Sequence, residues 1–373
     1  MSDANKIPAG PKDLTPALLT ELVSTVHPDV RITDARVTKI KNYGDADTTS
    51  SVSTSIQVSL EVRYEKPCKL PTHVLAKMSI PEDADCANPP LEPFFENEVA
   101  FYQRLRSELD IEAPQAMGGR FDPVTGRYVL LMEDLSPRTP HVNIMMDEDN
   151  VAVVQALLTT LASVHAHFWQ SPRFASDLSW VQNHLAGSLE TLLDGPVRLH
   201  IVNELARERF KREFAQELGV SEAEMFAGVK ALKRHQSTLP QTLLHGDAHF
   251  GNTYVMPDGT GGLLDWQIMV RGYLMHDIGY LIQTALSVEG RRKHERELLA
   301  HYREQLRAKG AKDAPDLESL WLEYRCSMLY GFYMGWLTAP RENYGLEVCV
   351  VGNHRTKTAC IDHESVKLVR QLM

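Results

Sequence analysis

The stretch from Leu243 to Asp277 constrains the fold of this 373-residue chain more than any other part of its sequence. An apolar run leads into a tight polar loop that carries Asp247, and Asn252 follows five residues later. Beyond it, the turn sequence Pro257-Asp258-Gly259 separates two strand-like runs, the second of which leads to Asp265. These signals predict a hairpin that folds Asp265 back beside Asn252.

Such a hairpin would gather a carboxylate in a turn, an amide and a second carboxylate. Asp247 would then be available as a base, while Asn252 and Asp265 offer oxygen ligands to a hard cation. Phosphoryl transfer fits this set of groups, because its loose transition state needs positioning and charge neutralisation more than covalent chemistry.

A lysine and a glutamate in the first third of the chain form a second charged pair. The predicted strand from His73 to Ile80 carries Lys77 in its middle. In the helix predicted from about Pro93 to Arg106, Glu98 falls on the apolar stripe. Lysine is rarely buried without a partner and a carboxylate on a buried stripe needs a cation, so the two are expected to pair. A purely structural ion pair is the alternative.

These residues resemble the catalytic core of protein-kinase-like small-molecule kinases. The similarity is to the aminoglycoside phosphotransferase and choline kinase superfamily, with ecdysteroid-kinase-like (CHK kinase-like) proteins as the nearest expected relatives. It is carried by His245-Gly246-Asp247-x-His249-x-x-Asn252 and by the later strand end at Asp265-Trp266. Protein kinases have His-Arg-Asp and Asp-Phe-Gly at these places, and the departures favour a small-molecule acceptor over a protein.

The resemblance implies a function for each of these residues. Asp247 would be the catalytic base, and Asn252 and Asp265 would bind Mg²⁺. Lys77, held by Glu98, would grip the α- and β-phosphates of ATP. The γ-phosphate would pass to a hydroxyl of a small molecule, which makes the chain a kinase with an alcohol group as acceptor.

The same resemblance implies an α+β, two-lobed protein-kinase-like fold with ATP bound where the lobes meet. A β-rich nucleotide-binding lobe would comprise residues 1–135 and end in a hinge, where backbone groups near Glu133 and Leu135 would bond the adenine edge. A loop from Gly44 to Ser51 would cover the phosphates, although an ordinary hairpin turn is the alternative there. Residues 136–373 would form a helical lobe with the catalytic loop and the acceptor site.

Helical patterns dominate the second lobe. Residues 151–169 place an apolar stripe on one helix face, whose His165 and His167 are expected to be core or surface residues. Further helical sections are predicted at 178–239, 280–288, 291–309, 315–336 and 354–373. The aromatic side chains near Tyr330 are expected mainly to pack between helices, with one or two lining the acceptor pocket. Asp277 resembles the buried acid that accepts backbone N–H groups of the catalytic loop, and His245 is expected to brace that loop.

Two other functions are consistent with parts of the pattern. His245, Asp247 and His249 alternate in two-residue steps and could bind zinc in a metallohydrolase, but that leaves Lys77 and Glu98 unexplained. A catalytically weak nucleotide-binding protein of the same fold is the second alternative.

Composition restricts the class of protein further. The chain is long enough for two domains, and its 43% hydrophobic and 24% charged content is that of a globular protein. A net charge of −10 argues against nucleic acid as a partner. Five cysteines without a close pair favour reduced thiols and a cytoplasmic location. The N-terminus has no signal-peptide pattern, and no apolar run is long enough to span a membrane. The acceptor's identity and the oligomeric state stay open.

Overall fold

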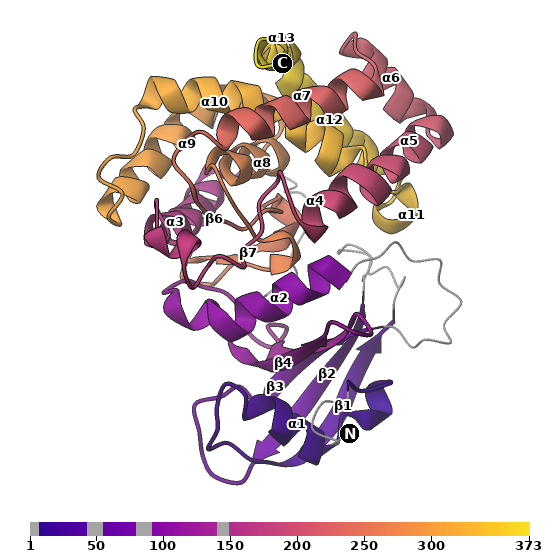
Figure 1. The fold of residues 1–373 in the computed structure, drawn as a ribbon, viewed down its shortest axis with the longest axis vertical. Helices are drawn as coiled ribbons and strands as arrows, with labels where there is room; N and C mark the ends of the chain where they lie inside the picture. The colour runs from indigo at the N-terminus through magenta and orange to yellow at the C-terminus, as the bar shows by residue number, and fades with distance from the viewer. Residues whose placement is uncertain (1–6, 43–54, 80–91, 140–148) are drawn as a thin grey trace. The chain divides into compact units, whose positions relative to one another are not determined.

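The computed structural model describes residues 7–42, 55–79, 92–139 and 149–373. The chain forms two compact units, Met1–His141 and Val142–Met373. The first contains a β-sheet and the second is mainly helical (Figure 1), so the predicted α+β class is confirmed. The sequence-based expectation was that the helical lobe begins at residue 136, a few residues before Val142, where unit 2 begins.

Unit 1 is built on a five-stranded antiparallel sheet with the order β1-β2-β3-β5-β4. The strands are β1 (Ile32–Lys41), β2 (Ile56–Tyr64), β3 (His73–Met78), β4 (Ala116–Asp122) and β5 (Arg127–Glu133). Two helices accompany them, α1 (Pro16–Val23) and α2 (Glu92–Arg104). Strand β3 and helix α2 lie within a few residues of the strand and the helix that the sequence predicts there.

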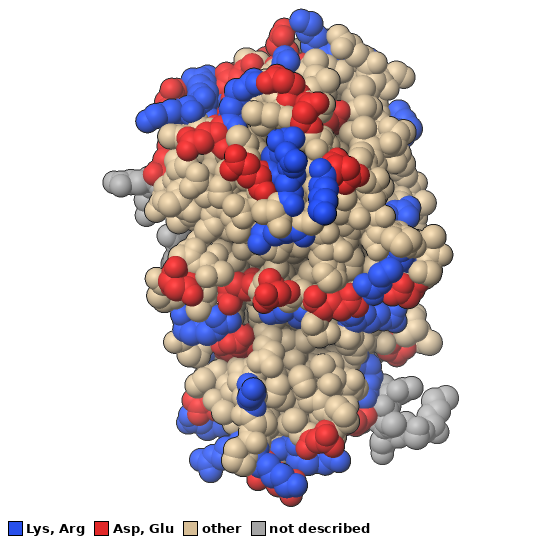
Figure 2. Space-filling model, turned by 90° about the vertical axis from the view of Figure 1, so that its left-hand side faces the viewer, with Lys and Arg blue, Asp and Glu red and all other residues tan. Residues whose placement is uncertain are grey.

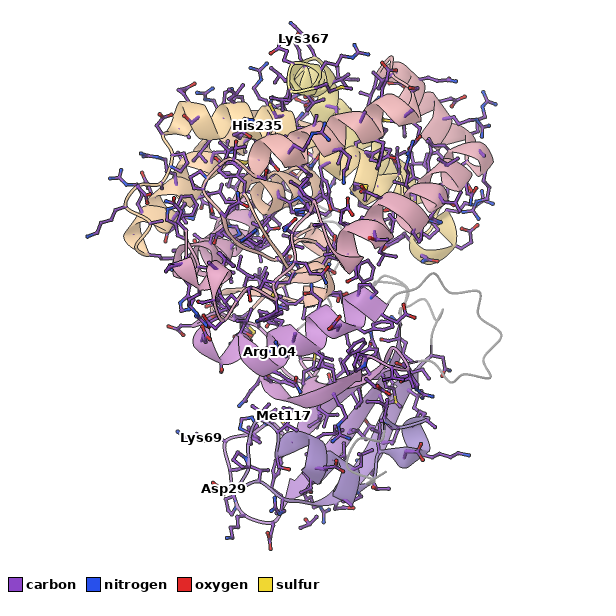
Figure 3. The ribbon with its side chains drawn as sticks, viewed as in Figure 1. Asp29, Lys69, Arg104, Met117, His235 and Lys367 are labelled. Atoms are coloured by element: carbon purple, nitrogen blue, oxygen red, sulfur yellow. The ribbon has the colours of Figure 1, made fainter. Side chains whose placement is uncertain are left out.

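One face of the sheet is buried by α1. The helix begins at Pro16, because Thr15 caps it by accepting the Leu18 N–H and proline suits the first helical position. Its buried leucines pack against alternate residues of β2, such as Val58 and Leu60, and the fully buried Met117 of β4 (labelled in Figure 3) joins this core. The period-2 alternation of the strands thus assigns their aliphatic residues to the α1 face.

The other face carries α2. Lys77 lies between Ala76 and Met78, whose side chains point to the α1 side, so its own side chain points the opposite way. Tyr128 shares the Lys77 face, and its ring stacks on Phe95 of α2 with the centroids 4.3 Å apart. This contact holds α2 against the sheet, so that its inward-facing residues reach Lys77.

Unit 2 is a helical assembly with short antiparallel strand pairs. Its longer helices are α3 (Val151–His167), α5 (Arg198–Arg207), α6 (Arg209–Glu217), α7 (Glu222–Gln236), α8 (Met275–Ala285), α9 (Val288–Ala308), α10 (Leu317–Tyr330) and α12 (Leu346–Asp362). Shorter ones are α4 (Ser188–Leu192), α11 (Arg341–Tyr344), α13 (Ser365–Arg370) and two π-helical turns, η5 (Leu193–Val197) and η8 (Gly331–Trp336). The strands are β6 (Thr242–Leu244), β7 (Thr253–Val255), β8 (Gly261–Leu263) and β9 (Val270–Gly272).

Two predicted helical sections are more broken than the sequence pattern indicates. The section 178–239 contains the π turn around Pro196, an extended residue at Glu208 and a left-handed Gly219. Proline removes a helical N–H donor, and the other two backbone conformations end a helix. The C-terminal section is split at Glu364, whose φ of 53° separates α12 from α13.

Helix α8 lies at the centre of unit 2. All of its residues are buried, as expected for a helix that contacts α3, α10 and α12 on different sides. The stripe predicted on α3 is also fully buried, including Leu157 and Leu161. On the face of the protein shown in Figure 2, acidic and basic side chains are interspersed. None of the helices in the described ranges combines the length and the hydrophobicity needed to cross a bilayer.

Candidate active site

The predicted hairpin of the catalytic stretch is present. Strands β7 and β8 pair with Thr253 opposite Leu263, and the backbone N–H of Leu264 donates to the Asn252 carbonyl at 2.8 Å. Asp265 follows directly. The turn at residues 257–259 therefore brings Asp265 back to Asn252, as the sequence predicts.

Asn252 is bonded to Asp247. Its side-chain Nδ2 donates to the backbone oxygen and to Oδ2 of Asp247, both at 3.0 Å. Because the nitrogen is used in this way, the amide oxygen Oδ1 is the atom left for a cation. The Asp247 side chain is about 30% exposed, so its carboxylate can meet a ligand.

Asp265 has an unusual backbone conformation. Its φ of 60° and ψ of 74° lie in the left-handed region, which a non-glycine residue rarely adopts. The residue stands at the start of the 3₁₀ turn η7 (Trp266–Ile268), whose Trp266 is fully buried. Strained backbone of this kind persists only where the surroundings enforce it, and it is concentrated at functional sites.

His245 braces the loop, as expected. Its Nε2 contacts the Leu264 carbonyl at 2.6 Å, and its Nδ1 accepts the Asp247 N–H at 3.3 Å. A carbonyl only accepts hydrogen bonds, so Nε2 carries the proton and the ring is neutral. Burial lowers the pKa of His245 and keeps it in that form.

Gly246 is required by the geometry of the loop. Its φ is +86°, and a Cβ added there would overlap the backbone oxygen of Ile268. No side chain fits this position, which accounts for the glycine where the protein-kinase pattern has arginine.

The Asp277 carboxylate anchors the backbone of the loop that carries Asp247. It accepts the His245 N–H at 2.7 Å and the Gly246 N–H at 2.9 Å. His165 lies 3.2 Å from the same carboxylate and 2.7 Å from the Tyr302 hydroxyl, which makes it a core histidine. Burial alone would raise the pKa of Asp277, but the His165 hydrogen bond and the nearby histidines lower it to about 2.

Three tyrosine side chains lie within electrostatic range of Asp247. Burial raises the pKa values of Tyr280, Tyr330 and Tyr344, and the charge of Asp247 raises each of them further. Tyr280 also contacts the ring of His249, with 5.8 Å between centroids. Of the aromatic residues singled out in the sequence, Tyr330 is therefore in electrostatic reach of Asp247.

In unit 1, the expected pair of Lys77 and Glu98 is formed. Lys77 Nζ lies 2.7 Å from Glu98 Oε1. The lysine side chain is 10% exposed and the glutamate side chain 0%. Helix α2 thus presents a desolvated carboxylate to the middle of β3, where it pairs with the largely buried lysine.

The predicted hinge residues take part in local bonds. The Glu133 N–H donates to Gln115 at 3.0 Å, and the Leu135 carbonyl accepts the Arg138 N–H at 2.9 Å. Arg138 also forms an ion pair with the Glu133 carboxylate at 2.6 Å. Gly44 and Ser51, the predicted phosphate loop, lie outside the described residues.

The geometry does not favour the zinc site. Both ring nitrogens of His245 are already hydrogen-bonded, and His249 Nδ1 accepts the Gly251 N–H at 3.0 Å. His249 Nε2 is 3.8 Å from Asp247 Oδ2, too long for a hydrogen bond. Across the part of the chain that the structure describes, no three His, Cys, Asp or Glu side chains are grouped to hold a metal ion.

The sequence matches the phosphotransferase enzyme family over residues 85–318, more than half of the chain. The chain belongs to this family. As a phosphotransferase it is a kinase-type enzyme. No curated protein sequence matches it.

Solved phosphotransferase structures are similar to this phosphotransferase at low identity. The GDP complex of wild-type aminoglycoside 2′-phosphotransferase-IIIa is 11% identical, with a TM-score of 0.46 over 93% of this chain and 99% of the other. Macrolide 2′-phosphotransferase MphH from Brachybacterium faecium is 15% identical, with 0.43 over 85% and 91%. Spectinomycin phosphotransferase in complex with ADP and spectinomycin is 10% identical, with 0.45 over 90% and 94%.

Sequence reasoning missed two tyrosines of the phosphotransferase that lie within electrostatic range of Asp247. Tyr280 and Tyr344 are distant from Asp247 in sequence, and neither belongs to a motif. The sequence feature that could have indicated the position of Tyr280 is Gly335. A Cβ added at Gly335 would lie only 2.6 Å from the Tyr280 hydroxyl, so a glycine is needed there. Such a glycine has meaning only once the packing of α8 against η8 is known.

Proposed function

We propose that the chain transfers the γ-phosphate of ATP to a hydroxyl group of a small molecule. The observation that carries this proposal is the arrangement of Asp247, Asn252 and Asp265 on one hairpin. A carboxylate available as a base is hydrogen-bonded to the Asn252 amide, and the backbone bond of Leu264 to Asn252 brings the next residue, Asp265, back to this position. An amide oxygen and a carboxylate are ligands that suit a hard cation.

Asp247 is the proposed catalytic base. Its Oδ2 accepts the Asn252 amide, so Oδ1 is the oxygen that we assign to the acceptor hydroxyl. As that hydroxyl attacks the γ-phosphorus, the carboxylate takes up its proton. The fixed orientation of the loop, through Asp277 and His245, places the carboxylate before the acceptor binds.

Asn252 Oδ1 and Asp265 are the proposed ligands of Mg²⁺. Two protein oxygens suit this ion, which keeps several waters and takes further ligands from the phosphates. When bound, it neutralises charge on the β- and γ-phosphate oxygens.

Lys77 and the hinge are the proposed nucleotide-binding groups of unit 1. Glu98 holds the Lys77 ammonium, whose remaining N–H groups are assigned to the α- and β-phosphates. Since the Glu133 N–H and the Leu135 carbonyl are already bonded, the adenine contacts are assigned to the Glu133 carbonyl and the Leu135 N–H. Gly44 and Ser51 remain the proposed phosphate-covering residues.

The acceptor is proposed to be hydroxylated and largely apolar. Tyr280, Tyr330 and Tyr344, the aromatic groups near Asp247, suit an apolar framework better than a polycation. This is also the class to which the ecdysteroid-kinase-like resemblance points. The free thiols of the described cysteines accord with a cytoplasmic location.

The test is ATP consumption with panels of hydroxylated metabolites, amino-alcohols and aminoglycosides. We expect magnesium-dependent turnover with at least one apolar hydroxylated compound and phosphate attached to its hydroxyl. Turnover confined to the aminoglycoside panel would contradict the acceptor class. Magnesium-dependent ATP binding without turnover in any panel would support the catalytically weak alternative instead.

A further inference from the structure

A cavity of about 250 Å³ in unit 2 has an unusual charge balance. Its lining includes Lys233 of α7, Arg271 of β9 and two histidines, His184 and His276. No lining residue, in the part of the chain that the structure describes, is an aspartate or glutamate. The chain as a whole carries a net charge of −10, so this concentration of cationic groups is local.

Lys233 differs from the other buried lysines that the structure describes. Lys77 pairs with Glu98 at 2.7 Å, Lys211 with Glu204 at 2.5 Å and Lys357 with Glu217 at 2.5 Å. These three obey the rule that a buried cation has a carboxylate partner.

The Lys233 ammonium contacts only weak or neutral partners. It is 6% exposed, bonds Nδ1 of His276 and lies 4.4 Å from the Tyr330 ring centroid. No carboxylate of the described residues forms an ion pair with it. Burial lowers its pKa to about 7, and the charge of Asp277 opposes this shift from a distance, without an ion pair.

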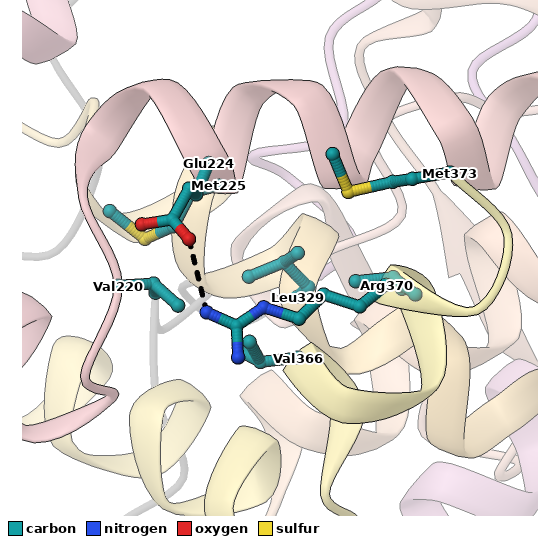
Figure 4. A pocket seen from close by; sticks show the side chains of 8 residues that line it. Val220, Glu224, Met225, Leu329, Val366, Arg370 and Met373 are labelled. Carbon is teal, nitrogen blue, oxygen red and sulfur yellow. Dashed lines mark hydrogen bonds and ion pairs between the residues drawn. The ribbon is translucent and has the colours of Figure 1, made fainter.

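Other donors of the cavity are also unsatisfied. Nε2 of His184 and Nε of Arg271 are buried and have no hydrogen-bond partner among the described residues. Buried polar atoms without partners are uncommon, and a role in holding a ligand is one physical reason for them. Another cavity, near the C-terminus, differs from this one because it is smaller and its lining is mostly apolar. The arginine in its lining, Arg370, already forms an ion pair with Glu224 at 3.1 Å (Figure 4).

We propose that this cavity is a binding site for a small oxyanion, a carboxylate or a phosphate, held by Lys233 and Arg271. The guanidinium presents planar donors that match either group, and the ammonium supplies a desolvated point charge. His184 adds a further donor when its Nε2 carries the proton. The ligand supplies the directly bonded anionic partner that, among the described residues, Lys233 does not have.

The site is connected to the catalytic loop. His276 Nε2 donates to the Gly246 carbonyl at 2.8 Å, which leaves Nδ1 to accept from Lys233. Lys233 therefore lies two hydrogen bonds, and an oxyanion bound to it three, from the residue that precedes Asp247. That it influences turnover rests on the proposed function, whereas binding itself does not.

The test is isothermal titration calorimetry of the 373-residue protein with sodium phosphate and, separately, with sodium malonate, both at neutral pH. Potassium chloride holds the ionic strength constant, and no nucleotide or acceptor is present. We expect saturable binding of at least one anion, with Kd raised about tenfold or more in Lys233→Met and in Arg271→Gln. Comparison of the two Kd values shows whether the cavity prefers a phosphate or a carboxylate.

One control variant separates binding in this cavity from binding at the protein surface. Arg234→Gln changes an exposed cation next to Lys233 on α7 that does not line the cavity. It should bind the anion as the wild type does. Absence of saturable binding, or wild-type affinity in Lys233→Met and Arg271→Gln, would overturn the proposal. If Lys233→Met does not fold, Arg271→Gln alone decides.

Discussion

The Asn252 amide is bonded at once to the backbone carbonyl and to the carboxylate of Asp247, each at 3.0 Å. One side chain therefore orients the proposed base and presents an oxygen to the proposed metal ion. The two roles can be separated by substitution.

Asn252→Asp should retain magnesium-dependent nucleotide affinity, since it still offers an oxygen ligand. It replaces the N–H donor by a second negative charge beside Asp247, so we expect turnover to fall by about 10- to 100-fold. Asp265→Ala is the matched comparison, which should lose the magnesium dependence itself. Unchanged turnover in Asn252→Asp would show that the bond to Asp247 does not orient the base.

Lys77→Met removes the ammonium that pairs with the fully buried Glu98 carboxylate. We expect a loss of about 3–5 kcal/mol in the free energy of unfolding, together with loss of nucleotide turnover. The double variant Lys77→Met/Glu98→Leu removes both charges and should recover most of the stability in denaturant titrations, but not the turnover. Recovery of turnover as well would mean that the pair is structural only.

Gly246→Ala introduces a Cβ that overlaps the Ile268 carbonyl, so the loop must move. Gly259→Ala is the control, because Gly259 has a similar φ of +88° but no atom within 4 Å of the added Cβ. The control should lose about 1 kcal/mol of stability from backbone strain alone, with normal turnover. Gly246→Ala should lose clearly more stability and nearly all turnover, and equal losses in thermal unfolding would contradict the steric account.

The local geometry of the site could be predicted from the sequence where one short signal decided it. The turn at residues 257–259 brought Asp265 to Asn252, and helical spacing placed Glu98 rather than Glu96 on the buried side of α2. Asp277 was expected to accept backbone N–H groups of the loop, and it does.

Contacts between distant helices could not be predicted. Lys233 of α7 and His276 of α8 are 43 residues apart in the chain and meet only in the folded unit 2, and neither residue type nor spacing indicates this. The predicted C-terminal helix is interrupted because Glu364 adopts a left-handed conformation, which is unusual for glutamate and leaves no pattern in the sequence.

The ionisation of Asp277 makes the free energy of unfolding depend on pH in the acid range. Its pKa is lowered from 3.8 to about 2, so the ionised form stabilises the fold above about pH 4 and this contribution is lost as the pH falls towards 2. Between about pH 5 and about pH 3, the gap in unfolding free energy between wild type and Asp277→Asn should narrow by about 1 kcal/mol. A gap that stays constant or widens over that range, measured by denaturant titration, would exclude an ionised Asp277.

The central claim is that Asp247 acts as the base. Asp247→Asn keeps the size of the side chain and an oxygen that can accept the Asn252 amide, but removes the charge. The most direct measurement is turnover beside Mg-ATP affinity in this one variant. We predict a fall of about 10²–10⁴-fold in turnover with near-normal folding and Mg-ATP affinity. Unchanged turnover, or magnesium binding that weakens together with turnover, would contradict the assignment.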